Sequence, residues 1–126
     1  MLAHTRALIA VSAYAAIAGK KVAGVYDHSA GEHLRIAAEC RGNRLMGADG
    51  ERAVAFGGTL PEIYDDGGRA FISMEIEGGG GATGYDRGSE SHYKVQVVDR
   101  VVQLFDYGES AWFAFEVQFA EDAAGL

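Results

Sequence analysis

The side chains best suited to binding a metal ion gather early in the chain, at Asp27, His28 and His33. One carboxylate and two imidazoles form a ligand set that Zn²⁺ accepts. An aspartate recurs at the same place in four later segments, however, and only one of these repeats the histidine, as Asp86 and His92. A turn-forming role explains an aspartate without a histidine, whereas a ligand role does not. We therefore expect no metal site and no cofactor. If a metal ion did bind, Asp27, His28 and His33 would be its ligands.

Two further patterns suggest catalysis or nucleotide binding. Cys40, the only cysteine, follows His33 by seven residues, so on one continuous strand the two side chains would point to opposite faces. Gly79-x-Gly81-x-x-Gly84 matches the dinucleotide fingerprint, but a predicted strand follows it, so no helix N-terminus is present to hold a pyrophosphate. No acid, base and nucleophile converge on one face of a predicted element. We predict that the protein is not an enzyme.

Residues 20–119 repeat one unit five times. Each unit starts with a leading residue that is followed at once by aspartate, and the leading residues are Tyr26, Ala48, Tyr64, Tyr85 and Phe105. Apolar and polar side chains alternate from eight residues after each leading position, which is the period of a strand with one solvated face. Each unit is therefore predicted to be a β-hairpin whose turn begins at the aspartate.

The alternation also predicts the register within each hairpin. The expected partners nearest the turns are Val25–Leu34, Gly47–Phe56, Ile63–Ile72, Gly84–Tyr93 and Leu104–Phe113, and those further out are Ala23–Ile36, Leu45–Gly58, Ala82–Val95 and Val102–Phe115. Each aspartate is expected to accept hydrogen bonds from backbone N–H groups two or three residues later. Gly67, Gly88 and Gly108 share one turn position, where we expect them to supply a positive φ. The unit around Asp49 is the most divergent, and we expect a shorter hairpin there.

Residues 1–19 have the composition of a helix that is apolar nearly all round, which is typical of a buried helix. Thr5 is the expected N-cap, and Gly19 the expected end. The apolar run is too short for the roughly 20 residues that span a bilayer, so no membrane span is predicted. An alternative interpretation is a secretory signal that ends at Ala16-Ile17-Ala18. We expect a cytoplasmic protein with a retained helix, or an exported one if residues 1–18 are a cleaved signal peptide.

Together these elements predict a mainly β fold in a single domain, residues 1–126. Residues 1–19 form the N-terminal helix, 20–119 the hairpin repeats and 120–126 a loose tail. About ten strands are expected in an up-and-down antiparallel meander, a curled sheet or barrel packed around or against the helix. The last strand, Trp112–Phe119, would recruit another chain if its edge stayed bare, so it closes onto the first strand or pairs across a dimer. We expect copies of the protein to associate with one another through this terminal strand.

Large rings at the leading position and seven residues later should lie on the outer face of the sheet. They form a predicted rim of Tyr64, Phe71, Tyr85, His92, Phe105 and Trp112. Such rings either brace one another across strands or provide a recognition strip for a sugar, a peptide or another protein. The functional hypothesis is a non-catalytic binding or assembly module with a protein or glycan partner. The alternative is a small carrier that encloses an apolar ligand in the curled sheet.

The net charge of −7 argues against two classes of partner, nucleic acids and anionic membrane surfaces, because both require a basic patch. A single cysteine excludes an internal disulfide and favours a reducing compartment.

The segment Tyr64-Asp65-Asp66-Gly67-Gly68-Arg69 resembles the YD repeats of large bacterial toxin and cell-surface proteins, which recur as β-hairpins at about this period. The whole of Lys20–Gln118 is similar to small uncharacterised bacterial proteins built from such aromatic-Asp hairpins. This resemblance implies an architecture and no activity.

Overall fold

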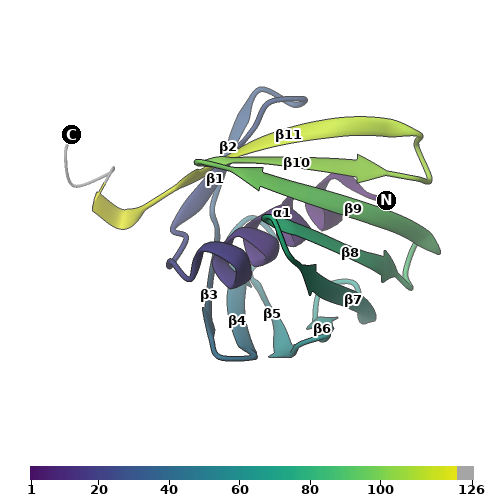
Figure 1. Cartoon of the computed structure of the whole chain (residues 1–126), viewed down its shortest axis with the longest axis horizontal. Helices are drawn as coiled ribbons and strands as arrows, with labels where there is room; N and C mark the ends of the chain where they lie inside the picture. Colours follow the sequence, from purple (N-terminus) through teal and green to yellow (C-terminus); the bar gives the residue numbers. More distant parts are fainter. Residues whose placement is uncertain (122–126) are drawn as a thin grey trace.

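The structure is a computed structural model that describes residues 1–121, and within them one helix is surrounded by a single antiparallel sheet (Figure 1). The elements in chain order are α1 (Ala3–Ala18), β1 (Gly24–Asp27), β2 (Glu32–Leu34), β3 (Ile36–Arg41), β4 (Arg44–Asp49), β5 (Val54–Thr59), β6 (Glu62–Asp65), β7 (Ala70–Glu77), β8 (Gly81–Asp86), β9 (Ser91–Val98), β10 (Val101–Asp106) and β11 (Ala111–Gln118). The mainly β meander with one N-terminal helix is confirmed. Of the predicted tail, residues 122–126 lie outside the described part.

The sheet is nearly closed, like a barrel. Its strand order is β2-β1-β11-β10-β9-β8-β7-β6-β5-β4-β3, so the last strand pairs with the first. Gly24 lies opposite Gln118, and Asp27 lies opposite Phe115. This closure was one of the two predicted outcomes for the terminal strand. Because β1 already covers that edge, nothing in the pairing supports self-association through β11.

The structure has eleven strands instead of ten because the strand after the first turn breaks at Arg35. The Arg35 N–H donates to the Glu51 carboxylate at 2.9 Å, and the Arg35 carbonyl accepts from the Gly50 N–H at 2.6 Å. Because of these bonds, Arg35 is not part of either strand. β2 before it pairs with β1, and β3 after it pairs with β4. The predicted pair Ala23–Ile36 is therefore wrong. An isolated bridge between Val22 and Ala38 joins the two ends of the sheet instead.

The remaining predicted pairs are present in the register of the sheet. Inward side chains such as Phe115 are buried, and the outward Glu75 and Lys94 are exposed. One inner position departs from the pattern, since Ile76 is 44% exposed near the end of β7.

The helix α1 occupies the inside of the curled sheet, and every residue from Ala7 to Ala15 is buried. An all-round apolar surface suits this position, because strands surround the helix on every side. Its N-cap is Leu2, which makes no side-chain capping bond, so the prediction of Thr5 as N-cap is wrong. Gly19 ends the helix in the left-handed conformation, as expected. Within residues 1–121, no helix is both long enough and apolar enough to cross a membrane.

All five hairpin turns contain four residues, so the turn at Asp49 is no shorter than the others. The unit around Asp49 is shorter in its second strand, since β5 has 6 residues and β7, β9 and β11 have 8 each. In every turn it is the fourth residue that has a positive φ, and these residues are Gly31, Ala53, Arg69, Glu90 and Ser110. The assignment of positive φ to Gly67, Gly88 and Gly108 is therefore wrong. Glycine at Gly67 and Gly108 leaves room for side chains of a neighbouring hairpin, since a Cβ would crowd Arg52 and Val54 at the first position and Ser91 at the second.

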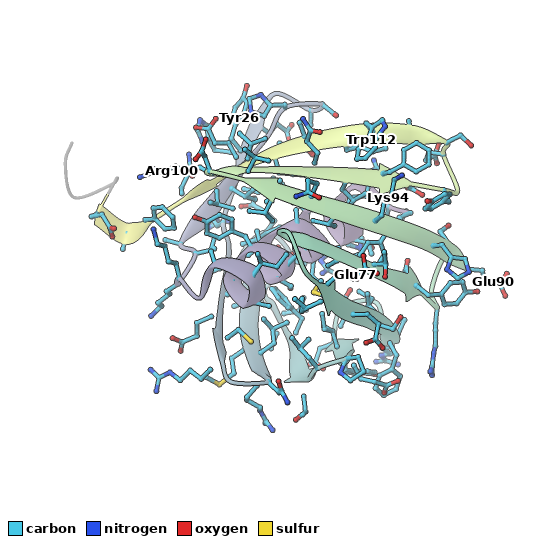
Figure 2. The ribbon with its side chains drawn as sticks, in the orientation of Figure 1. Tyr26, Glu77, Glu90, Lys94, Arg100 and Trp112 are labelled. Atoms are coloured by element: carbon cyan, nitrogen blue, oxygen red, sulfur yellow. The ribbon has the colours of Figure 1, made fainter. Side chains whose placement is uncertain are left out.

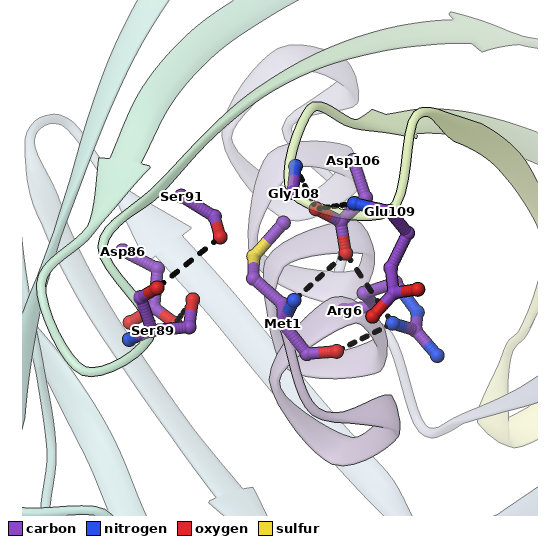
Figure 3. A network of polar contacts seen from close by, with 8 residues as sticks. All are labelled: Met1, Arg6, Asp86, Ser89, Ser91, Asp106, Gly108 and Glu109. Carbon is purple, nitrogen blue, oxygen red and sulfur yellow. Dashed lines mark hydrogen bonds and ion pairs between the residues drawn. The ribbon is translucent and has the colours of Figure 1, made fainter.

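The five turn aspartates point inward, at 0–5% exposure, around the N-terminal end of α1. Each accepts at least one hydrogen bond from the backbone of its own turn, as predicted. Figure 3 shows Met1 and Arg6 facing Asp106, and the Met1 amino group donates to Asp106 Oδ2 at 2.9 Å. Burial alone would raise the pKa of Asp106, but the bonds from the Met1 amine and from the turn N–H groups outweigh burial and lower it. Carboxylates at this position also complement the positive end of the helix dipole.

Candidate functional site

The six rings of the predicted rim lie on the outer face of the sheet, in three cross-strand pairs. The ring centroids are 4.9 Å apart for Tyr64 and Phe71, 4.6 Å for Tyr85 and His92, and 5.2 Å for Phe105 and Trp112. Each pair stands next to the aspartate that begins its turn, so the pairs follow the turn end of the barrel. Trp112 is 53% exposed and Phe71 is 40% exposed. Ring contact across strands and exposure to solvent therefore occur together in these pairs.

A groove of about 610 Å³ lies on the outer face beside one of these pairs, Tyr85 and His92. Two rows of side chains border it, and their order follows from the register. The first row crosses Ser73, Tyr85, His92 and Tyr107, and the second crosses Glu75, Thr83 and Lys94. The lining combines small residues with large rings, so the hollow follows from differences in side-chain size. The small residues are Ser73, Thr83 and Gly84, and the rings include Tyr85, His92 and Tyr107.

Opposite charges border the groove. Lys94 and Glu75 are two strands apart, with Thr83 between them, which corresponds to about 10 Å across the sheet. Lys94 Nζ lies 5.4 Å from the Trp112 ring centroid and 5.6 Å from that of Phe105. Figure 2 shows Lys94 and Trp112 on the same side of the sheet. Among the residues that the structure describes, neither Lys94 nor Glu75 has an ion-pair partner.

The backbone under the groove is fixed from inside the barrel. The buried Tyr93 ring passes Gly84, and its hydroxyl donates to the Ser73 carbonyl at 2.7 Å. A Cβ on Gly84 would overlap both the Ser73 carbonyl and the Tyr93 ring, so this position requires glycine. Burial, with Asp86 and Glu75 nearby, raises the pKa of Tyr93, which keeps the hydroxyl protonated as a donor. On the outer face, Ser73 Oγ accepts from the Tyr85 N–H at 3.0 Å.

The groove includes part of the predicted rim. Tyr85 and His92 border it, Phe105 and Trp112 adjoin it through Lys94, and Tyr64 and Phe71 lie outside it. Among the side chains that border the groove, the predicted rim omitted five, which are Ser73, Glu75, Thr83, Lys94 and Tyr107. Four of them are outward positions of strands whose alternation was recognised. The missing information was the register between hairpins, which decides which outward positions become neighbours.

The candidate metal ligands do not converge. Asp27 points inward and is buried, whereas His28 and His33 lie on the outer side. The Tyr26 ring contacts both imidazoles, with centroid distances of 4.8 Å to His28 and 4.7 Å to His33. Among residues 1–121, no three histidine, cysteine or acidic side chains lie close enough together to hold a metal ion.

Cys40 lacks the surroundings of a reactive thiol. Burial raises the pKa of the Cys40 thiol, and its Sγ lies 3.3 Å from the Gly42 carbonyl oxygen as a donor. A nucleophilic cysteine needs a lowered pKa, which a nearby cation or a helix N-terminus supplies.

No family model, curated protein or solved structure matches this chain. The case for the groove therefore depends on its geometry, and the resemblance to YD repeats stays a prediction.

Proposed function

We propose that the protein is a non-catalytic binding module that takes its ligand in the outer groove bordered by Tyr85, His92, Lys94 and Tyr107. The groove itself is the observation that supports this proposal. Its aromatic walls offer contact area at little cost in rotamer entropy, and its charged side chains have no ion-pair partner among residues 1–121.

The position of α1 weighs against the alternative of a carrier. A ligand enclosed by the sheet would have to take the place of a helix whose residues from Ala7 to Ala15 are all buried. The outer groove requires no such rearrangement. If the ligand binds on the outside, the residues of the interior contribute to stability alone and not to binding.

The test is an NMR titration of the ¹⁵N-labelled protein with a panel of neutral trisaccharides, acidic trisaccharides and short peptides. We expect at least one probe to shift the amide signals of Ser73, Thr83, Lys94 and Tyr107 selectively. Shifts that are confined to other faces of the barrel would contradict the proposal.

Tyr85→Ala and Tyr64→Ala form a matched pair for this test, because both residues lead a hairpin and contact the ring seven positions later. Their effects on stability should be similar. Only Tyr85 borders the groove, so only Tyr85→Ala should abolish the shifts. Equal loss of binding in both variants would show that the groove is not the site.

A further inference from the structure

We infer that the ligand of the groove is a neutral oligosaccharide, an inference that depends on the proposed function. Three properties of the described residues lead to this class of ligand: the closure of the sheet, the ring at one end of the groove and the balance of charge across it.

Closure of the sheet removes the usual mode of binding for an extended peptide. Such a peptide gains most of its affinity by adding a strand to an exposed sheet edge. Each of β7, β8, β9 and β10 has a neighbouring strand on both sides. Recognition in the groove therefore has to use side chains alone, and this favours a ligand whose own ring faces and hydroxyl groups supply the contacts.

Tyr107 provides a held ring at one end of the groove. Its centroid is 4.8 Å from that of Phe105 in an edge-to-face contact at 80°, and 51% of the residue is exposed. An aromatic face carries partial negative charge, and the C–H groups on the face of a pyranose ring carry partial positive charge. A sugar ring can therefore pack on Tyr107 without an ordering cost for the protein side chain.

The charge pattern favours a neutral sugar. Glu75 can accept two hydroxyl hydrogen bonds and Lys94 can donate three, so each pairs with the hydroxyl groups of a sugar. A disaccharide can span the roughly 10 Å between them. A polyanion would be repelled by Glu75 and by the net charge of −7, and a polycation would be repelled by Lys94. A ligand without net charge avoids both repulsions.

The test titrates the full chain with cellotriose and chitotriose as neutral probes, with trigalacturonate as an acidic probe, and with a hexapeptide that contains lysine and glutamate. We expect a neutral trisaccharide to bind most tightly and to shift Ser73, Thr83 and Tyr107. Tyr107→Ala and Glu75→Gln should each weaken that binding about tenfold. Tyr64→Ala and Glu116→Gln are the controls outside the groove, and both should bind like the wild type.

The outcomes separate this inference from the proposed function. If trigalacturonate or the peptide shifts the groove residues and neither neutral sugar does, the groove binds a ligand but the neutral-sugar assignment is wrong. If no probe shifts the groove, both proposals are wrong. Equal weakening by Glu75→Gln and Glu116→Gln would also contradict the assignment, because both residues are exposed glutamates on strands and only Glu75 borders the groove.

Discussion

One turn aspartate, Asp106, serves two structural purposes at once. Asp106 accepts N–H groups from Gly108 and Glu109 in its own turn, and it also binds the Met1 amine and Arg6 at the start of the helix. The first purpose follows from local sequence and was predicted correctly. The second depends on the helix lying inside the sheet, so spacing alone gives no indication of it. Five such carboxylates can be buried because backbone donors, nearby cations or the helix dipole compensate for the loss of water.

The fourth turn residue offers a sharp test at the level of single residues. Ala53 holds φ at 56°, where a Cβ is strained, so Ala53→Gly should raise the free energy of unfolding by about 1 kcal/mol. Gly31 occupies the same place in the first turn with φ at 68°, so Gly31→Ala should lower it by about the same amount. Urea unfolding followed by Trp112 fluorescence measures both changes. Two shifts of the same sign would refute the assignment.

Glycine illustrates the limit of prediction at this scale. The sequence shows Gly67, Gly88 and Gly108 at one recurring position, and a positive φ is the usual local reason for such a pattern. The actual reason at Gly67 and Gly108 is a side chain from a neighbouring hairpin. Contacts of this kind depend on how the hairpins pack, which no local pattern reports.

At the scale of elements, the register inside each hairpin could be predicted because one face of every strand is buried. A slip of one residue would turn each apolar side chain to solvent. The break at Arg35 could not be predicted in the same way. It results from bonds to Gly50 and Glu51, about 15 residues further along the chain, and these bonds exist only once the first two hairpins lie side by side.

Gly84 and Gly78 allow a crowded position on β8 to be compared with an open position in the turn between β7 and β8. Gly84→Ala should lower the free energy of unfolding by about 3 kcal/mol, since the Cβ displaces the Tyr93 ring and breaks its bond to Ser73. Gly78 has no neighbouring atom within 4 Å of an added Cβ, so Gly78→Ala should change it by about 0.5 kcal/mol or less. Thermal melts of the two variants make the comparison. A Gly84→Ala protein that melts like the wild type would show that Tyr93 does not pass this residue.

At the scale of the whole molecule, the sequence predicted a sheet curled around or against one helix, and the structure shows the first of these arrangements. The candidate site could be predicted only in part. The rings of the rim could be placed on the outer face from their spacing, yet the groove also needed the register between β7 and β8, which belong to different hairpins. That register depends on how the hairpins pack side by side, which no pattern within one hairpin reports.

Two leucines near the start of the chain test the position of the helix. Leu8 is fully buried inside the barrel, so Leu8→Ala should lower the free energy of unfolding by about 2–5 kcal/mol. Leu2 is 64% exposed, so Leu2→Ala should change it by about 0.5 kcal/mol or less. Chemical unfolding of both variants gives the difference. If both behave like the wild type, the helix is not part of the folded core, and the signal-peptide interpretation is the better one.

Closure around a helix has a consequence for how such a protein can change in evolution. An open array of repeats can gain or lose a unit by gene duplication or deletion, because each unit contacts only its neighbours. Here five hairpins encircle one helix, whose diameter with side chains is about 10–12 Å, and the width of a barrel increases with its number of strands. A sixth hairpin would leave empty space beside the helix, and four would leave too little room for it. The copy number is therefore constrained by the helix inside, and variation is left to the outward side chains.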